Sequence, residues 1–373
     1  MPYEIDFIGV GKEKAEKDAS AVCFRWTDSR GVCRVGVYDG GFKPHGEEMC
    51  RILNRYYFDD PKAEKPVDEK VIDFVVVSHS DSDHVNGLKV ILESFSIKAI
   101  YINRPWLYAS ELIDNATDGR TTIGSLERRL RAAYAPIVEI EEMAQERGIE
   151  INDAFEGTEI AERFRILSPT REFYLGLIKE SQKTPVEAAS LYESLMHADF
   201  RKAREYIKRL WESWTIERLR DETTTTPENE MSVVLLGKLD ENILLTGDAG
   251  IRALNAACDY AELEECEISK SVKFLQVPHH GGRHNVTPAV LDRLVGEIVP
   301  EDTSPHMTCF VSVAEGSDHP LQMVVNAFTR RGAKVYKTDG GTINHHCGDV
   351  PDREGWSTIK RLNLEPFVEE YDD

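Results

Sequence analysis

Short runs of β-branched and aromatic residues, separated by glycine or charged residues, recur towards both ends of the chain and predict β-strands. Residues 71–77 (VIDFVVV) are apolar except for one aspartate, which is typical of a strand covered on both faces. Residues 231–246 (MSVVLLGKLDENILLT) contain two apolar runs around 239–241 and predict a hairpin. The other predicted strands are 5–9, 20–26, 33–38, 98–103, 273–277, 308–313, 334–337 and 342–345.

Two stretches have helical spacing instead. In 125–147, Leu126, Leu130 and Tyr134 recur every four residues, and Pro136 interrupts the pattern. The segment 171–226 carries no strand signal, and five of its apolar residues step by three and four positions, as on one face of a helix. These five are Phe200, Ala203, Ile207, Leu210 and Trp214.

This pattern indicates two strand-rich halves separated by a helical insertion. We therefore expect one α/β domain over 1–350, interrupted by the insertion at 171–226, and an acidic C-terminal tail over 351–373. No internal repeat is visible.

Composition and charge narrow the class of protein. The chain has 373 residues, of which 41% are hydrophobic and 30% charged, and this balance excludes wholesale disorder. Its 45 basic and 66 acidic residues give a net charge of −21, which argues against coating nucleic acid by nonspecific phosphate neutralisation. An enzyme that binds a phosphodiester through metal ions remains compatible with this charge.

The sequence predicts a cytoplasmic protein. It has no apolar stretch long enough to span a bilayer, and its first twenty residues lack a basic and then apolar export signal. Its seven cysteines are scattered, odd in number and never spaced as C-x-x-C, so free thiols are expected and no zinc ribbon is visible.

The insertion departs from the acidity of the rest of the chain. Between Asp199 and Arg220 there are seven basic and four acidic residues, a local charge of +3. One interpretation is a solvated helical hairpin that packs on the core. The other is a basic lid over an acidic metal site, with Arg201, Arg204 and Lys208 on one face and in contact with substrate.

The strongest chemical signal follows the predicted buried strand directly. Residues 78–87 read SHSDSDHVNG, and His79, Asp81, Asp83 and His84 form an H-x-D-x-D-H cluster. A strand that ends in a tight turn can direct these side chains at one point. Imidazole suits zinc, manganese or iron, and carboxylate also accepts harder ions, so the cluster predicts a metal site.

Further histidine and aspartate residues follow other apolar runs. Asp39 follows RVGVY, Asp248 follows ENILLTG, and His279 and His280 follow KFLQVP. Singly, Asp39 and Asp248 could be turn formers. Four such clusters at predicted strand ends favour one shared site.

Together these segments resemble the metallo-β-lactamase superfamily of hydrolases, and within it the soluble hydrolase domain of the ComEC competence protein. The motif H-x-D-x-D-H is similar to that branch, with Asp81 where the superfamily usually has a second histidine. The further similar segments are IDFIGVG, VGVYDGG, NEMSVVL, ILLTGDAG, VPHHGGRHN, DHP and VYKTDGGTI, so that the resemblance covers roughly 1–170 and 228–346.

The resemblance implies an αβ/βα four-layer sandwich with an active site at the strand ends and two divalent ions, zinc or manganese. Asp39 would orient either a ligand or the turn from behind, and two such ions would activate a shared hydroxide. The implied ligands are His79, Asp81 and His279 for one ion, Asp83 and His84 for the other, and Asp248 as the bridge.

Two departures from the superfamily pattern stand out. The histidine expected between the first cluster and Asp248 has no clear equivalent, because only His197 lies in that interval and it reads as a surface residue of the insertion. Asn229 or Ser232 is expected to face the vacated space and to contact substrate. Gly282 stands where the branch usually has a small polar residue.

Several histidines lie outside this implied ligand set. Asp83 and His280 are the catalytic candidates, with His280 donating a proton to the leaving group, contacting phosphate or capping a turn. His319 is a candidate for substrate contact, and His284 for a place near the site. His345 and His346 are assigned no role.

Three functions compete at this level. The first is a metal-dependent phosphodiesterase or nuclease acting on DNA or nucleotides. The second is a metallohydrolase of a non-nucleotide ester or small phosphoester, which the net charge favours. The third is a degenerate metal site that serves as an interaction module, motivated by the missing histidine. No membrane partner is expected, and protein partners are not identified.

Overall fold

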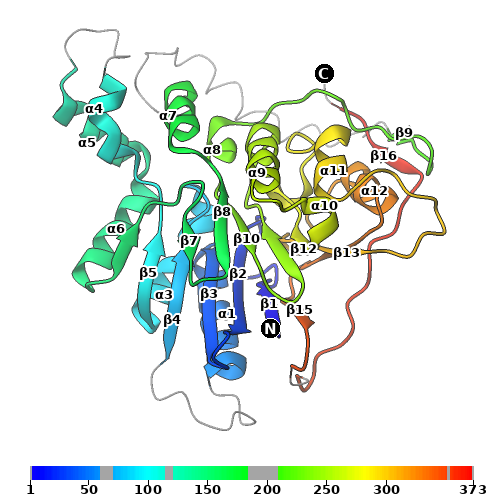
Figure 1. Cartoon of the computed structure of the whole chain (residues 1–373), viewed down its shortest axis with the longest axis horizontal. Coiled ribbons are helices and arrows are strands. Elements are labelled where there is room, and N and C mark those ends of the chain that lie inside the picture. Colours follow the sequence, from blue (N-terminus) through cyan, green and yellow to red (C-terminus); the bar gives the residue numbers. More distant parts are fainter. Residues whose placement is uncertain (1, 59–69, 114–120, 184–208, 351–352, 372–373) are drawn as a thin grey trace.

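The computed structural model describes residues 2–58, 70–113, 121–183, 209–350 and 353–371 (Figure 1). Two seven-stranded sheets form its centre, and helices cover their outer faces.

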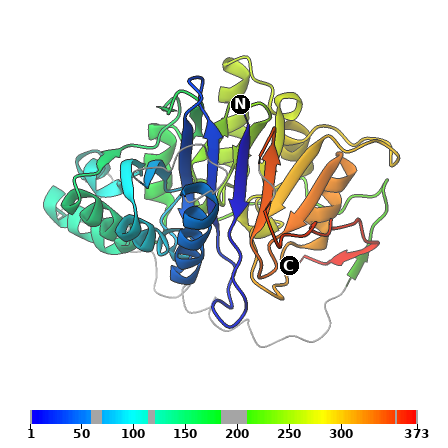
Figure 2. The same ribbon diagram turned by 90° about the horizontal axis from the view of Figure 1, so that it is seen from below.

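The first sheet has the strand order β15-β1-β2-β3-β4-β5-β6. It is antiparallel from β15 to β3 and parallel from β3 to β6. Figure 2 shows β15 beside β1, so that a late segment of the chain completes this sheet. The strands are β1 Tyr3–Phe7, β2 Ala21–Thr27, β3 Cys33–Gly40, β4 Val71–Val76, β5 Ser96–Tyr101, β6 Glu150–Asn152 and β15 Ile343–Cys347.

The second sheet has the order β14-β13-β12-β11-β10-β8-β7. Its strands are antiparallel from β7 to β11 and parallel from β11 to β14. The strands are β7 Glu159–Ile160, β8 Phe164–Ser168, β10 Val234–Gly237, β11 Asn242–Leu245, β12 Val272–Gln276, β13 Met307–Val311 and β14 Ala333–Lys337.

Aromatic side chains fill the space between the two sheets. Phe7 of the first sheet contacts Phe274 and Phe310 of the second, with ring centroids 5.7 and 5.4 Å apart. Phe24 and Phe164 make a similar contact at 5.1 Å. These rings are buried and belong to one apolar cluster that draws on both sheets, so the sheets pack face to face.

Each sheet also packs on helices through its other face. Val75 of β4 points outward into a cluster with the helices of the first half, whereas Phe74 and Val76 point into the inner core. This alternation explains why 71–77 is almost wholly apolar. The longer helices are α1 Lys43–Ile52, α5 Ile123–Ala133, α6 Ala135–Glu146 and α7 Arg171–Glu180 in the first half, and α9 Ile251–Leu263, α11 Pro288–Leu294 and α12 Gln322–Arg330 in the second.

The molecule is therefore an αβ/βα four-layer sandwich, and the fold class predicted from the sequence is confirmed. The hairpin at 231–246 is confirmed as β10 and β11. The interruption at Pro136 is confirmed too, because α5 ends at Ala133 and Pro136 lies in the first turn of α6.

Short strands and helical turns complete the described elements. The strands β6, β7 and β8 were not predicted from the sequence. The remaining short helices are α2 Ser82–Val85, α3 Leu88–Ser94, α4 Ala109–Leu112, α8 Pro227–Glu230 and α10 Ile268–Ser271, with single turns η1 Leu53–Phe58, η2 Pro105–Tyr108 and η5 His279–Gly281. None of the described helices is long and apolar enough to cross a membrane.

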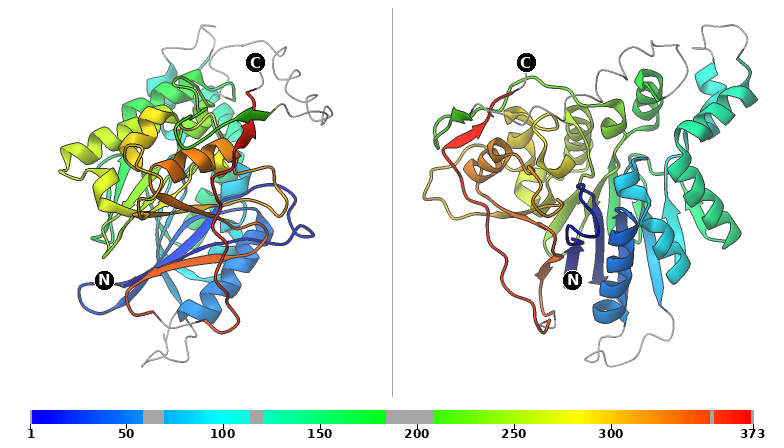
Figure 3. Two further views of the ribbon diagram at one scale, coloured as in Figure 1. Left: turned by 90° about the vertical axis from the view of Figure 1, so that its right-hand side faces the viewer. Right: turned by 180° about the vertical axis from the view of Figure 1, so that it is seen from behind.

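The insertion is only partly helical where the structure describes it. Helix α7 opens it, but Leu210 lies in strand β9, Arg209–Trp211, so the expected continuous helical face does not extend to Trp214. Strand β9 pairs with β16, Phe367–Glu369, beside α12 (Figure 3). The described part of the expected C-terminal tail, 353–371, therefore packs on the domain through Val368, which is buried.

Candidate metal centre

Parallel strands bring the candidate residues together at one edge of the sandwich. Asp39 lies at the end of β3, and the H-x-D-x-D-H cluster follows its parallel neighbour β4. Asp248 follows β11, and the His279–His280 pair follows the parallel strand β12. Because the carboxyl ends of parallel strands meet at one sheet edge, residues far apart in the sequence converge here.

The first cluster is shaped by a strand that turns directly into a helix. Helix α2 begins at Ser82 with Asp81 at its N-cap, so Asp83 and His84 occupy the first helical turn. This turn lies against the backbone at the end of β3, and the Gly87 N–H donates to the Gly41 carbonyl over 2.7 Å. His79 and His84 consequently lie close together, with ring centroids 4.2 Å apart.

Asp39 supports the cluster from behind. One of its carboxylate oxygens accepts a hydrogen bond from the Ser78 backbone N–H at 2.8 Å, and the other accepts one from the Ser78 hydroxyl. The second oxygen also lies 2.8 Å from Nδ1 of His84. Both Asp39 and His84 are completely buried. Such a contact fixes the ring so that Nε2 faces the site.

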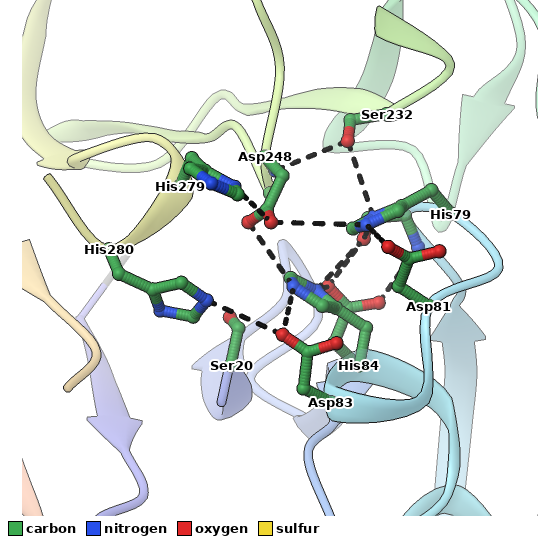
Figure 4. A network of polar contacts seen from close by, with 12 residues as sticks. Ser20, His79, Asp81, Asp83, His84, Ser232, Asp248, His279 and His280 are labelled. Atoms are coloured by element: carbon green, nitrogen blue, oxygen red, sulfur yellow. Dashed lines mark hydrogen bonds and ion pairs between the residues drawn. The ribbon is translucent and has the colours of Figure 1, made fainter. Parts of the chain in front are cut away.

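The second half of the site is built on strained backbone. His279 and His280 have φ values of 47° and 55°, and Gly281 follows at 80°. Two consecutive non-glycine residues in the left-handed region are costly, and such strain is concentrated at functional sites. The turn directs the imidazole of His279 at Asp248 and that of His280 at Asp83 (Figure 4).

Four ligand atoms surround one position. Asp83, His84, Asp248 and His280 each offer an atom, and these atoms all lie within 4.8 Å of one another. Nε2 of His84 is 3.2 Å from Oδ1 of Asp248 and 3.7 Å from Oδ2 of Asp83. Nε2 of His280 is 3.5 Å from that same oxygen of Asp83. One divalent ion fits the centre of this group.

A second, looser position lies on the other oxygen of Asp248. Nε2 of His79 is 3.9 Å from Oδ2 of Asp248 and 3.9 Å from Oδ2 of Asp81. Nδ1 of His279 hydrogen-bonds that oxygen of Asp248 at 2.6 Å, and Lys183 makes an ion pair with Asp81 at 2.7 Å. An ion at this position would have to compete with these two contacts.

The strongest sign of metal binding is a set of unpartnered nitrogens. Nε2 of His79, His84 and His280 are all buried, and none of them makes a hydrogen bond to another described residue. Carboxylate oxygens of Asp81, Asp83 and Asp248 lie 3.2 to 3.9 Å from these nitrogens. Leaving such groups unpaired is costly unless a ligand satisfies them. Nδ1 of His280 is meanwhile held by the Ser312 carbonyl at 2.7 Å, which leaves Nε2 to face the site.

The carboxylates and imidazoles of the site shift each other's pKa values. Burial disfavours the imidazolium of His280, but Asp248 and Asp83 outweigh this and raise its pKa to about 9. The same carboxylates raise the pKa of His84, against the effect of its burial. Burial would raise the pKa of Asp248, but His84 and His279 hold it well below its usual value. Protons therefore occupy the imidazoles of His84 and His280 when no metal is bound, whereas burial and His84 lower the pKa of His79.

The structure brings most of the predicted residues into this site. Ser232 lies behind it, with its hydroxyl 3.3 Å from Nδ1 of His79, and Asn229 lies 3.4 Å from Nδ1 of His279. His280, for which the sequence left a proton donor, a phosphate contact or a turn cap open, offers Nε2 to the group of four potential ligand atoms. His197 and the three basic residues predicted for a lid, Arg201, Arg204 and Lys208, lie outside the described residues.

Several residues at the site had no clear signal in the sequence. The Asn285 amide donates to the Asp248 carbonyl at 2.8 Å, although only its place in the HHGGRHN segment hinted at this. The partner of His280 is the backbone carbonyl of Ser312, which no motif could reveal. Lys183 reaches Asp81 from the beginning of the insertion.

An open groove of about 2020 Å³ runs from this centre across the second half of the molecule. Asp81 and His279 mark its inner end, and residues 365–371 form part of its outer wall. Its described lining includes seven carboxylates but only two lysine or arginine side chains, Lys183 and Arg283. The groove is therefore acidic over its described walls.

Comparisons with known proteins give structural matches alone. No protein-family model matches the chain, and no curated protein does. The chain is similar in structure to AidC, a dizinc quorum-quenching lactonase, at 10% identity and a TM-score of 0.29, over 69% of this chain and 72% of that one. It is also similar to the metallo-β-lactamase SMB-1, at 8% identity and a TM-score of 0.29, over 78% and 86%. Both likenesses are weak, so the layers and side chains described above define the fold and the site.

Proposed function

We propose that this protein is a metal-dependent hydrolase of the metallo-β-lactamase superfamily, in its ComEC-like branch, and that it cleaves phosphodiester bonds in small nucleotides or short single strands. The observation that carries the proposal is the set of three buried Nε2 atoms at the site, of His79, His84 and His280, that have no hydrogen-bond partner among the described residues. A site kept only as an interaction surface would gain nothing from leaving them unpaired.

The division of ligands follows the two oxygens of Asp248. One ion would be held by Asp83, His84 and His280, on the side of Asp248 where Oδ1 lies near His84. A second would be held by His79, Asp81 and His279, on the side where Oδ2 lies near His79. This assignment moves His280 from the role of proton donor to that of ligand. The mixture of carboxylate and imidazole suits zinc or manganese.

The residues of the chain would orient and stabilise this centre. Two bound ions would lower the pKa of a shared water towards ~7 and neutralise charge on the attacked group. Asp39 fixes the His84 ring, and the Ser312 carbonyl fixes the His280 ring. Lys183 offers a positive charge beside Asp81 at the inner end of the groove, where an anionic group of the substrate would approach the ions.

The charge of the groove limits the substrate. A long nucleic acid would bring many phosphates against the seven carboxylates of the described walls. A substrate with one or two phosphates brings its charge only to the ions. We therefore favour a small nucleotide or a strand end over a duplex that lies along the groove.

The same acidic wall favours one second candidate, an uncharged carboxylic ester or lactone. Such a substrate avoids repulsion altogether, and the same ions would polarise its carbonyl oxygen.

Metal analysis and activity on the same preparation test the proposal. The native chain and an Asp83→Ala, His84→Ala double variant would be assayed with manganese or zinc on bis(4-nitrophenyl) phosphate, a dinucleotide, short single-stranded DNA and 4-nitrophenyl acetate. The exposed His346 provides a matched control, His346→Ala. Bound metal and phosphodiester cleavage that only the double variant loses would support the proposal. Ester cleavage alone would favour the second candidate, and a chain that takes up no metal would overturn both.

A further inference from the structure

A carboxylate–imidazole pair lies beside the metal centre without belonging to its ligand set. Oδ2 of Asp18 is 2.8 Å from Nδ1 of His319 and also accepts the Ser317 hydroxyl at 2.9 Å. Oδ1 accepts the Ala314 backbone N–H at 2.8 Å. Three contacts thus fix the carboxylate, which in turn fixes the imidazole ring.

The position of His319 follows from the sheet. It belongs to the segment after β13, the parallel neighbour of β12, as the ligand histidines belong to the segment after β12 itself. Pro320 packs on Gly281, and the Leu321 N–H donates to the Gly281 carbonyl at 3.2 Å. The turn that carries His279 and His280 and the segment that carries His319 therefore hold each other in place.

The ring of His319 faces the groove that begins at the metal centre. Its side chain is about one third exposed, and it lines the groove together with Asp81 and His279. With Nδ1 directed at Asp18, the nitrogen left for a substrate is Nε2. Among the described residues Nε2 has no hydrogen-bond partner.

Asp18 is suited to hold this ring. Burial would raise the pKa of its carboxyl group, but the hydrogen bond from His319 and those from Ala314 and Ser317 lower it to about 2. It is thus a carboxylate across the ordinary pH range. A carboxylate on Nδ1 selects the tautomer and the orientation of an imidazole and offsets its charge when both nitrogens are protonated.

Hydrolysis needs a proton at the leaving oxygen. His280 is poorly placed to give one, because Nδ1 is occupied by Ser312 and Nε2 faces the ligand atoms of Asp83 and Asp248. We propose that His319 is the catalytic acid of this site and that Asp18 is its positioning residue. This inference rests on the proposed hydrolase function and adds a group that contacts the leaving oxygen.

Protons balance over the proposed hydrolysis step. The bond between phosphorus and the leaving oxygen breaks, its electron pair stays on that oxygen, and the oxygen takes the proton from Nε2 of His319. The attacking water supplies hydroxide to phosphorus. Its remaining proton returns to His319, so the enzyme is unchanged after one turnover.

A leaving-group comparison on the metal-loaded enzyme tests this role. A dinucleotide leaves as an alkoxide that needs a proton, whereas bis(4-nitrophenyl) phosphate leaves as a stable phenolate. We expect His319→Gln to lower kcat on the dinucleotide by about 100-fold or more and to change kcat on the nitrophenyl ester by less than about fivefold. Asp18→Asn should show the same selectivity with a smaller loss, about tenfold, and His346→Gln should match the native enzyme on both substrates.

Two further measurements do not depend on turnover. Metal content should be the same in the native, His319→Gln and Asp18→Asn proteins, and the ¹⁵N spectrum of His319 should show a protonated Nδ1 that Asp18→Asn removes. Equal losses on both substrates, loss of metal in His319→Gln, or a spectrum insensitive to Asp18 would overturn the inference.

The failure of the proposed function would look different. A native enzyme that binds metal and cleaves neither phosphodiester would refute the proposed activity and the acid role with it. A native enzyme that cleaves both, and whose His319→Gln variant loses neither selectively, would refute the acid role alone.

Discussion

Three non-glycine residues at the site adopt a left-handed backbone conformation, which only Ala161, Glu162, Glu265 and Asp339 share among the other described non-glycine residues. Asp39, His279 and His280 all have positive φ values. Asp39 contacts His84 from behind the site, and His279 and His280 lie at the site itself (Figure 4). The cost of each such conformation, about 1–3 kcal/mol, must be offset by the packing of the two sheets around them.

The residue scale also shows where sequence reasoning reaches its limit. The sequence predicts a metal site at the H-x-D-x-D-H cluster because four potential metal ligands within six residues rarely occur together on a solvated loop. It does not predict the separate directions of His279 and His280. Adjacent residues in an unusual turn point in directions that depend on φ, and only the structure shows that both reach Asp248.

Asp39 gives a prediction at this scale. Replacing it as Asp39→Asn keeps its size but removes the charge that fixes His84, so the metal affinity should fall about 10–100-fold. Competition with a chromophoric chelator would measure this. Asp259→Asn, an exposed change on α9, should leave the affinity unchanged. Equal affinities for all three proteins would contradict the supporting role of Asp39.

Metal uptake should release protons. The pKa of His280 is about 9 and that of His84 is raised as well, so both imidazoles are largely protonated at pH 7 without metal and must lose those protons to become ligands. The apparent affinity should therefore rise with pH up to about 9. Calorimetry in buffers of different ionisation enthalpy would give the number released, and a value of zero at pH 7 would contradict the protonated site.

At the scale of elements, close backbone contact with the end of β3 holds helix α2, which carries Asp83 and His84, in place. Gly87, just after α2, lies so near the end of β3 that an added Cβ would stand 1.9 Å from the Gly40 carbonyl oxygen. Gly46 of α1 is equally close to Gly87, because a Cβ added to Gly46 would stand 2.3 Å from the Gly87 carbonyl oxygen. The glycines therefore let α2 place Asp83 and His84 against Asp39.

Gly87→Ala should consequently destabilise the fold by roughly 2–4 kcal/mol and weaken metal binding, since either the helix or the strand end must move. Gly176, inside α7, has open space where a Cβ would stand. Gly176→Ala should therefore be neutral or stabilise the chain by up to about 1 kcal/mol. Chemical denaturation of both variants would decide, and equal midpoints would show that the close contact relaxes cheaply.

Elements were predictable where their pattern was strong. The long apolar strands and the proline-broken helices matched the structure because burial on one or both faces dictates their composition. The strands β6 and β7 are too short for a periodic signal. Strand β9 forms by pairing with β16, more than 150 residues away, and local spacing carries no information on such a partner.

At the scale of the whole molecule, the net charge of −21 and the acidic groove act in the same direction. A substrate with one or two phosphates contacts few cations, so kcat/KM should fall only by about threefold to tenfold between 50 and 200 mM NaCl. A protein that neutralises six or more phosphates would lose about a thousandfold or more over the same range. A steep loss on short substrates would point to a basic surface that the described groove does not provide.

The pairing of β1 with β15 has a consequence for biosynthesis. Strand β1 is made first, yet its neighbour on one side, Ile343–Cys347, leaves the ribosome only after the whole second sheet. During that interval the N-terminal half presents an unpaired strand edge, the feature most prone to intermolecular pairing. The nascent chain is therefore expected to depend on chaperones until β15 closes the edge, and stalling translation before residue 343 should yield an aggregation-prone intermediate.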